Sequence, residues 1–371
     1  MSVNNSDLSQ ITWSNITRQA LFTSWLDSCK NQFSLDLASL RLASADASFR
    51  RYFRIFGSNG PDTSYVIMDA PPDKENCDSF VAVASILKKA GLLVPSVLNW
   101  NRDDGFLLLT DLGTHTLLHH LGTEQDLTHA LVTPPLKPFL QALDALVLLQ
   151  KVNTPNVFPE YDAALLNKEL SLFPDWYLTK HKELTLSSEQ NNTLSDTFSL
   201  LIKSNLSAPK VFVHRDFMTR NLMLPNDQQE HRLGVLDFQD AVIGPITYDI
   251  ASLMRDAFCS WSEEFVLDVT VRYWERIRKT GIIDENGWSE DFGEFWRAVE
   301  WMGLQRHLKV AGIFARLTIR DHKPKYLADA PRFITYIRNT AQRYRELFPF
   351  LRMLDKIENT PTNDAFSFGR I

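Results

Sequence analysis

The stretch that decides the fold of this 371-residue chain is VFVHRDFMTRNLMLPNDQQEHRLGVLDFQDA, residues 211–241. Its apolar start, residues 211–213, predicts a short strand that leads into the tripeptide HRD. Two more strands are predicted at 222–224 and 233–236, because the turn-forming sequence PND follows the first of them. Around this stretch the apolar residues recur mainly at helical spacing. We therefore expect a small β-rich island that carries polar residues between helices.

The second and third of these strands are expected to pair as an antiparallel hairpin. With Leu222 opposite Leu236, the next pair places Asn221 beside Asp237 at the open end of the hairpin. An amide oxygen and a carboxylate side by side are hard oxygen ligands of the kind that hold Mg²⁺ on substrate phosphates. Asp216, which precedes Asn221 on the same loop, is placed to accept a proton from a hydroxyl group. This order of base and two metal ligands predicts phosphoryl transfer.

Three other polar residues near this stretch have simpler expected roles. His214 is predicted to form hydrogen bonds within the loop and to brace it. Asp249 precedes an apolar helical run, so we expect it to cap that helix. Asp240 is expected either in a solvated turn or in support of the metal ligands. The alternative for the whole stretch is that its HxD sequence merely caps a turn at the end of a strand.

The overall composition limits the classes of protein to consider. Lysine and arginine number 39 against 45 aspartate and glutamate, which gives a net charge of −6 and argues against a protein that works mainly by binding nucleic-acid phosphates. Three widely separated cysteines exclude a disulfide scaffold and fit a reducing compartment. No apolar run approaches the ~20 residues of a membrane span, and the first residues lack a signal-peptide pattern. We expect a cytoplasmic monomer with no nucleic-acid or membrane partner.

The chain is expected to form two domains with a boundary near residue 113. Residues 1–113 predict a helix, strands, a second helix and more strands, with a hairpin at about residues 49–69 around the turn sequence GSNGPDT. Residues 114–371 are mainly helical in pattern. The expected fold class is α+β, with a small β-rich lobe and a larger, mainly helical lobe.

The order of these features resembles the aminoglycoside phosphotransferase-like family of small-molecule kinases. The resemblance rests on HRDFMTRN (214–221), VLDFQD (235–240) and YDIASL (248–253) behind a β-rich first lobe. Longer blocks, among them LFPDWYL (172–178) and QRHLKVAGIFARL (305–317), are similar to the anomeric N-acetylmuramate and N-acetylglucosamine kinases of bacterial cell-wall recycling. The resemblance therefore implies a two-lobed, protein-kinase-like fold, in which residues 1–113 bind nucleotide and residues 114–371 carry catalysis and substrate binding. It also implies that Asp249 braces the catalytic loop.

The same resemblance implies roles for the polar residues. Asp216 would deprotonate or orient the anomeric hydroxyl of an amino sugar, and Asn221 and Asp237 would hold Mg²⁺ on the phosphates of ATP. The implied products are ADP and the sugar 1-phosphate, in peptidoglycan recycling. Phosphoryl transfer of this kind depends more on in-line positioning and charge neutralisation than on covalent catalysis.

Two departures from a kinase pattern concern the phosphate-binding strands. A protein-kinase-like strand would carry a lysine where SYVIMDA offers Met68 and Asp69. The turn in ASADASFRRYF contains no glycine, although a small residue such as Ser48 would still let backbone amides approach a phosphate. Arg50 or Arg51 is the candidate for the missing cation. The alternative for both arginines is an exposed strand face.

The sugar pocket is less clearly marked in the sequence. Glu169 could form hydrogen bonds with sugar hydroxyls, and Trp176 could stack on a sugar ring. Arg306 could bind the lactyl carboxylate of N-acetylmuramate in a bidentate manner. Each of these residues is also compatible with ordinary packing or with a surface position.

Two alternative functions remain open from the sequence. The chain could be a kinase for another hydroxyl compound, such as an aminoglycoside or an amino alcohol. It could also be a nucleotide-binding pseudokinase that acts as a scaffold, which the missing lysine and glycines would suit. The complete set of base and metal ligands argues against the scaffold.

Overall fold

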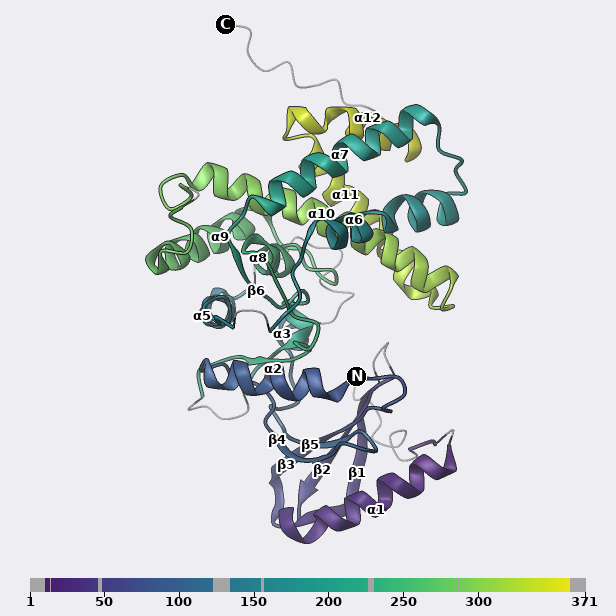
Figure 1. Cartoon of the computed structure of the whole chain (residues 1–371), viewed down its shortest axis with the longest axis vertical. Coiled ribbons are helices and arrows are strands. Elements are labelled where there is room, and N and C mark those ends of the chain that lie inside the picture. Colours follow the sequence, from purple (N-terminus) through teal and green to yellow (C-terminus); the bar gives the residue numbers. More distant parts are fainter. Residues whose placement is uncertain are drawn as a thin grey trace, which may run out of the picture. The chain divides into compact units, whose positions relative to one another are not determined.

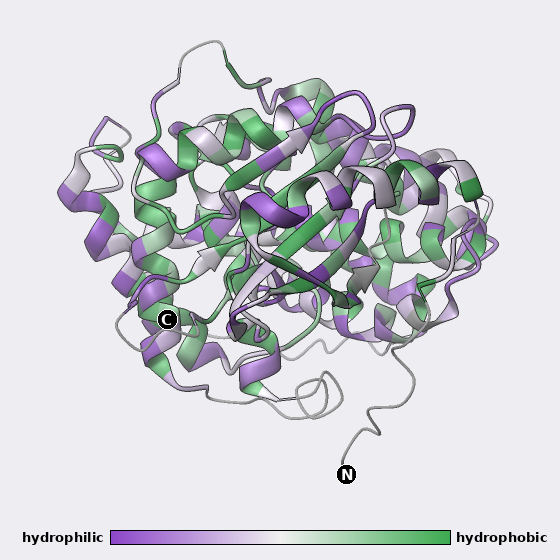
Figure 2. Ribbon diagram, turned by 90° about the horizontal axis from the view of Figure 1, so that it is seen from below, coloured by the Kyte–Doolittle hydropathy of each residue, from purple (hydrophilic) through white to green (hydrophobic). Residues whose placement is uncertain are grey.

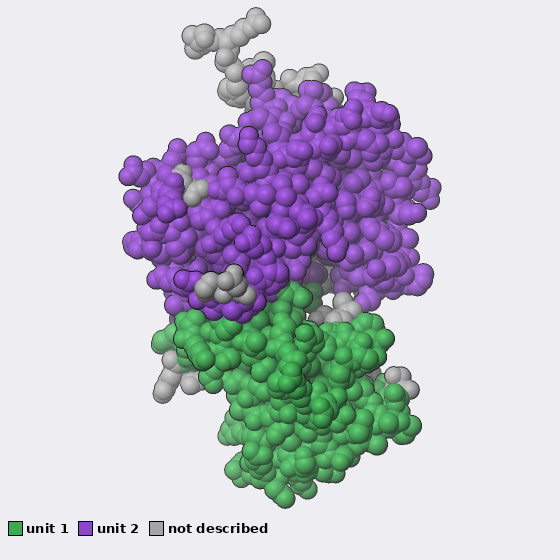
Figure 3. All heavy atoms as spheres, viewed as in Figure 1, with its two compact units in different colours: residues 1–121, 219–240 green, residues 122–218, 241–371 purple. Residues whose placement is uncertain are grey.

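The computed structural model describes residues 11–13, 15–45, 49–122, 134–154, 157–225, 230–285 and 287–360. The chain forms two compact units, coloured separately in Figure 3. Unit 1 contains residues 1–121 and 219–240, and unit 2 contains residues 122–218 and 241–371. These units differ from the single boundary expected at residue 113.

The chain returns to unit 1 because the hairpin that follows the HRD sequence pairs with that unit. Its two short strands are β7 (Leu222–Met223) and β8 (Gly234–Val235). Gly234 forms a bridge with Leu93, and Met223 forms one with Thr116. Local sequence patterns do not show such pairing between distant residues, so the return was not predicted.

Unit 1 is built on one five-stranded antiparallel sheet with the strand order β1-β2-β3-β5-β4. The strands are β1 (Leu35–Ala45), β2 (Arg51–Gly57), β3 (Gly60–Asp69), β4 (Val97–Asn101) and β5 (Phe106–Thr110). The predicted hairpin at residues 49–69 is confirmed as β2 and β3. Strand β1 was not predicted, although LDLASLRLASA contains the alternation of apolar and polar residues that favours a strand.

Two helices lie on opposite sides of this sheet, α1 (Ile16–Phe33) and α2 (Cys77–Lys89), as Figure 1 shows. The face toward α1 is apolar and aromatic. Phe22 of α1 packs against Phe53 and Phe106 of the sheet, with ring centroids 5.2 and 5.4 Å apart. Strand alternation therefore sends odd-numbered side chains of β2 toward α1 and even-numbered ones to the other face.

Unit 2 is mainly helical. Its helices are α5 (Leu136–Gln150), α6 (Ala163–Leu170), η1 (Phe173–His181), α7 (Ser188–Leu206), α8 (Thr247–Met254), α9 (Glu263–Ile277), η3 (Arg278–Thr280), α10 (Phe292–Ile319), η4 (Pro324–Asp329), α11 (Ala330–Ala341), η5 (Arg345–Leu347) and α12 (Phe348–Ile357). One antiparallel strand pair, β6 (Lys210–Val213) with β9 (Val242–Pro245), completes the unit. The described helices α3 (Leu117–Leu121) and η2 (Thr219–Asn221) belong to unit 1.

Helix α10 lies at the centre of the unit 2 core. Its apolar side chains pack with those of η1, α7, α11 and α12 in one cluster of buried residues. Both hydrophobic and hydrophilic residues occur along the helices in Figure 2, as expected for helices that bury one side. The contact between α10 and the start of η1 is close, because a Cβ at Gly312 would lie 2.3 Å from the carbonyl oxygen of Leu172. Only glycine permits this approach.

These two units confirm the expected α+β class, with a small β-rich part and a larger helical part. Among the described residues, none of the helices combines the length and the apolar character that a membrane span requires.

Candidate active site

The loop that follows β6 is held by a buried carboxylate on α8. Asp249 accepts hydrogen bonds from the backbone N–H groups of His214, at 2.7 Å, and Arg215, at 3.0 Å. Its side chain is fully buried, and burial raises the pKa of Asp249 to about 6 although both hydrogen bonds favour the charged form. Asp249 therefore braces the loop, which is one of the two roles expected for it, and lies inside the first turn of its helix.

Arg215 adopts an unusual backbone conformation at the centre of this loop. Its φ of 76° lies in the left-handed region, which is rare for a residue with a side chain. Its carbonyl oxygen accepts a hydrogen bond of 2.8 Å from Arg306, and its own guanidinium donates one of 2.8 Å to Glu169. Because these contacts fix both ends of the residue, the strained conformation persists and determines how the following residue, Asp216, is presented.

Asp216 is also fixed through its backbone. Its N–H donates to Nδ1 of His214 at 3.3 Å, and its carbonyl oxygen accepts from the N–H of Met218 at 2.9 Å. Nδ1 of His214 must lack a proton to accept this bond. His214 is fully buried, with its ring against Phe217, so it braces the loop as expected.

A buried group of charges surrounds this loop within unit 2. The carboxylate of Glu169 accepts from the Tyr161 hydroxyl, from Arg215 and from Lys309, whose ammonium lies 2.9 Å away. Burial alone would raise the pKa of Glu169, but Lys309 and Arg215 outweigh it and hold this pKa below its usual value. Lys309 also donates to the Tyr248 hydroxyl at 3.0 Å. Glu169 is thus ionised and fully engaged with internal partners.

The register of the predicted hairpin differs from expectation by one residue. Leu222 pairs with Val235 instead of Leu236, and the N–H of Leu236 donates to the carbonyl oxygen of Asn221 at 2.9 Å. A shift of one residue would normally turn Asp237 to the other face of the hairpin. The φ of Asp237, 62°, instead redirects the chain at that point.

Asn221 and Asp237 are nevertheless neighbours, both within unit 1. Nδ2 of Asn221 lies 3.5 Å from Oδ2 of Asp237, and Gln239 donates to the other carboxylate oxygen at 2.8 Å. Helix α2 supports this loop, because Ser79 donates to the Gln239 carbonyl at 2.9 Å and Phe80 stacks on Phe238. Asp237 therefore resembles Arg215, because it too has a positive φ on a polar loop that is held by contacts with its surroundings.

As ligands for a metal ion, one carboxylate and one amide would be a sparse set. Among the described residues, His, Cys, Asp and Glu side chains do not gather in any group of three or more that could enclose a metal ion. Mg²⁺ that arrives on nucleotide phosphates needs only one or two protein oxygens, because phosphates and water supply the rest. The donor set therefore fits phosphate-bound Mg²⁺.

The residues expected to bind phosphate separate into two environments. Arg51 points toward α1, where it donates to Oδ2 of Asp69 at 2.6 Å and lies over the ring of Trp13. Its partners are structural, so the structure does not support a phosphate contact for Arg51. Arg50 instead pairs with Glu75 at 3.0 Å. Ser48 lies outside the described residues.

The residues expected to contact sugar are not gathered at one exposed place. Glu169 and Arg306 are buried, with the internal partners described above. Trp176 lies on η1 and packs, partly buried, against the core cluster of unit 2. Asp240 is exposed.

Four residues of this arrangement were not predicted from the sequence: Arg215, Lys309, Glu75 and Gln239. Arg215 and Gln239 are adjacent to predicted residues, so their position was a usable signal. Lys309 and Glu75 lie far along the chain from their partners, and no local pattern marks them.

A comparison with known proteins agrees with this geometry. The phosphotransferase enzyme family matches residues 39–288. The chain belongs to this family. The matched region includes the HRD loop, Asn221, Asp237 and Asp249.

Two relatives with a named activity are similar over most of the chain. A Neisseria meningitidis protein named N-acetylmuramate/N-acetylglucosamine kinase is 45% identical over 338 residues, which cover 91% of this chain and 95% of that protein. A Pseudomonas aeruginosa protein of the same name is 46% identical over 332 residues, which cover 87% of this chain and 92% of that protein.

Solved structures of phosphotransferases share the fold. An ADP-bound aminoglycoside phosphotransferase matches with a TM-score of 0.52 at 16% identity, over 88% of this chain and 98% of its own. The ethanolamine kinase of Plasmodium vivax matches with a TM-score of 0.55 at 14% identity, over 92% of both chains. At these identities the likeness shows the fold alone, which is the kinase-like fold that the sequence predicts.

Proposed function

We propose that this protein is an ATP-dependent kinase that phosphorylates the anomeric hydroxyl of N-acetylmuramate, N-acetylglucosamine or both. The observation that carries this proposal is the 45% identity, across nine-tenths of the chain, to a protein named as a kinase for these two sugars. The sugar 1-phosphate would serve peptidoglycan recycling.

Asp216 is the residue that we propose to act on the sugar. Its backbone is held on both sides, which fixes the point at which its side chain leaves the loop. A carboxylate placed in this way can orient the attacking hydroxyl and accept its proton. Positioning of this kind accounts for much of the catalysis in phosphoryl transfer.

Asn221 and Asp237 are the residues that we propose to hold Mg²⁺ on the ATP phosphates. The metal would neutralise charge on the phosphates and orient the γ-phosphoryl group. Gln239 and helix α2 keep Asp237 in place. The positive φ of Asp237 is strain that such a role would explain.

Glu169 and Arg306 are proposed to position the catalytic loop. Both bind Arg215, whose conformation determines the direction of Asp216. We propose this role in place of the direct sugar contacts expected from the sequence, because both side chains are buried and already have partners. A sugar contact by Trp176 stays a prediction.

The proposal is tested by product analysis. Purified protein is incubated with Mg-ATP and with N-acetylmuramate, N-acetylglucosamine, glucose, kanamycin or choline, and phosphorus and proton NMR locate any new phosphate. We expect an α-1-phosphate on an N-acetylated amino sugar. A phosphate only on kanamycin or choline would replace this proposal with the aminoglycoside or amino-alcohol kinase. ATP binding without any product would favour the pseudokinase.

A further inference from the structure

The face of the unit 1 sheet that points away from α1 lacks the lysine of a kinase strand. Met68 occupies that place on β3 and is fully buried. Met68 pairs with Tyr52 of β2, so both side chains lie on the same face. Arg50 directly precedes β2, and its side chain interacts with that of Tyr52, which places it beside this face. Strand alternation sends Arg51 to the opposite face, toward Asp69 and Trp13.

Arg50 is held on this face by Glu75, directly before α2. The guanidinium lies 3.0 Å from the Glu75 carboxylate, and the two side chains are only 11% and 13% exposed. The other oxygen of Glu75 accepts from the backbone N–H of Phe49 at 3.2 Å. Glu75 thus fixes both the side chain of Arg50 and the backbone just before it.

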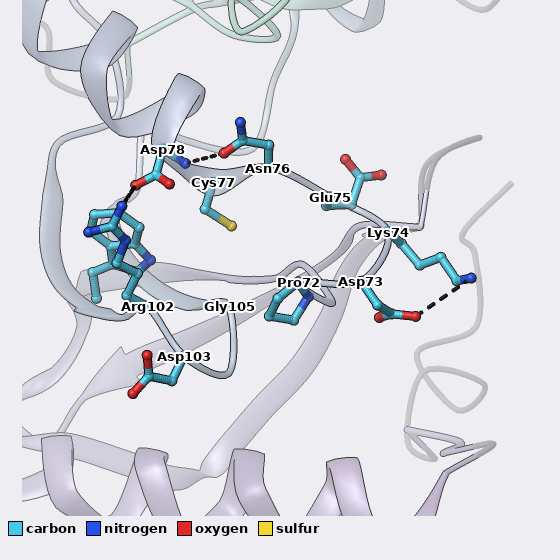
Figure 4. A pocket seen from close by; sticks show the side chains of 11 residues that line it. Pro72, Asp73, Lys74, Glu75, Asn76, Cys77, Asp78, Arg102, Asp103 and Gly105 are labelled. Carbon is cyan, nitrogen blue, oxygen red and sulfur yellow. Dashed lines mark hydrogen bonds and ion pairs between the residues drawn. The ribbon is translucent and has the colours of Figure 1, made fainter.

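The other cations near Glu75 have different partners. Figure 4 shows the segment 72–78, which lines a pocket of about 630 Å³ together with Arg102 and its neighbours. Lys74 turns to Asp73 and Arg102 pairs with Asp78. Among the described residues that line this pocket, neither Lys74 nor Arg102 forms an ion pair with Glu75. The ion pair of Glu75 is made with Arg50.

Arg50 also lies within electrostatic range of the proposed metal ligand. Burial lowers the pKa of Arg50, but Tyr52, Glu75 and Asp237 outweigh it and raise this pKa above its usual value. Helix α2 connects the two sites, because it begins beside Glu75 and its Ser79 and Phe80 hold the Asp237 loop. All these residues belong to unit 1.

We propose that Arg50 supplies the cation that binds the phosphates of the nucleotide in place of a strand lysine, and that Glu75 positions it. This inference rests on the proposed use of ATP. A guanidinium suits this task because its planar set of N–H donors matches phosphate oxygens. Glu75 keeps the guanidinium extended before the nucleotide arrives, which lowers the conformational entropy lost on binding.

The test measures nucleotide binding without sugar, so it does not depend on which sugar is phosphorylated. Binding of adenosine, ADP and a non-hydrolysable ATP analogue with Mg²⁺ is followed by calorimetry for the wild type, Arg50→Met and Arg50→Lys. We expect Arg50→Met to weaken ADP and ATP-analogue binding by about tenfold or more, as for a lost charge-assisted contact, and adenosine binding by less than about twofold. Arg50→Lys should retain most of the affinity.

Glu75→Gln tests the positioning role. It keeps an acceptor for the Phe49 N–H but removes the ion pair. We expect a weaker affinity for ADP than in the wild type and no further loss when the change is added to Arg50→Met, because both act through one guanidinium. A full further loss in the double variant would overturn the positioning role of Glu75.

A matched control and a rescue complete the test. Arg102→Met removes an exposed ion pair of the same unit and should leave ADP binding unchanged. Met68→Lys, added to Arg50→Met, places a cation on the same sheet face and should recover at least a third of the lost affinity, measured as log Kd. If the affinity did not recover, the proposal that Arg50 takes the place of a strand lysine would be wrong.

Two further outcomes are decisive. Wild-type ADP affinity in Arg50→Met would refute the proposal, and so would an equal loss for adenosine and ADP, which would indicate a structural role. Thermal unfolding without nucleotide shows whether each variant is folded before binding is measured. If the wild type bound ATP in an Arg50-dependent way but phosphorylated neither sugar, the proposed function would fail and this inference would stand.

Discussion

Arg215 shows at the scale of one residue how the candidate site is built. Its left-handed backbone is unfavourable by itself, and three partners stabilise it: Asp249 at its N–H, Arg306 at its carbonyl and Glu169 at its side chain. Such strain persists only where the surroundings hold it. The positions of these partners therefore determine the backbone path that leads into Asp216.

The first prediction concerns Asp216. Asp216→Ala should lower kcat for sugar phosphorylation by about 10²–10⁴-fold, because that is the usual contribution of a general base. Nucleotide affinity should change by less than about twofold. Steady-state kinetics and calorimetry measure the two effects, with the exposed Asp268→Ala on α9 as the control. A loss of activity below about tenfold would reject Asp216 as the base.

The second prediction concerns Asp237. Asp237→Ala should raise the Mg²⁺ concentration for half-maximal activity by about tenfold or more and should strongly reduce activity, because it removes the one carboxylate of the two proposed protein ligands. The Mg²⁺ dependence of ADP binding should shift in the same direction. Magnesium titrations of both quantities check this. An unchanged Mg²⁺ dependence would show that Asp237 is not a ligand.

At the scale of elements, helix α10 connects the core of unit 2 to the HRD loop. Its apolar residues pack in the core cluster, while its Arg306 and Lys309 reach the loop and Glu169. The close approach at Gly312 fixes α10 against the start of η1. The position of α10 along its own axis therefore determines where the side chains of Arg306 and Lys309 lie.

The third prediction tests this helix contact. Gly312→Ala should lower the free energy of unfolding by about 2–3 kcal/mol, because its methyl group would clash with the backbone of Leu172, which cannot move as a side chain can. Gly303→Ala on the same helix is the matched control, since its Cβ would meet the nearest atom at 3.5 Å. That change should be neutral or should stabilise the helix by up to about 1 kcal/mol. Urea unfolding of both variants checks the difference, and equal effects would contradict the close contact.

At the scale of the whole molecule, the buried Asp249 makes stability depend on pH. Its pKa is raised from 3.8 to about 6 in the folded protein, so the folded state holds this proton more tightly than the unfolded state. The stabilising contribution of this proton is fully present below about pH 4 and is lost as the pH rises through 6. A shift of this size corresponds to about 3 kcal/mol.

The fourth prediction follows from that dependence. Asp249→Asn removes the titrating group, so the stability of the wild type relative to this variant should decrease by about 2–3 kcal/mol between pH 4 and pH 7. Comparing the two proteins cancels the titration of the other carboxylates. Urea unfolding at a series of pH values measures the difference. A difference that did not change with pH would show that Asp249 has an ordinary pKa.

The sequence by itself determined the features that depend on neighbouring residues. Apolar periodicity and turn chemistry gave the helices, the hairpin at 49–69 and the α+β class. The HRD loop and the short hairpin after it brought Asn221 and Asp237 together, although the predicted register was wrong by one residue. Asp249 was expected to brace this loop only through the resemblance to kinase-like folds.

Only the tertiary structure decided which of the two adjacent arginines lies on the sheet face of the proposed nucleotide site. Arg50 and Arg51 have identical side chains and differ only in the face of the unit 1 sheet that they occupy. The tertiary structure also showed that Glu169 and Arg306 have internal partners, and that residues 219–240 pack with the first unit. These facts depend on contacts between residues far apart in the chain. The physical reason is that periodicity fixes which side of an element is buried, whereas the partner of a buried charge is fixed only when the elements pack together.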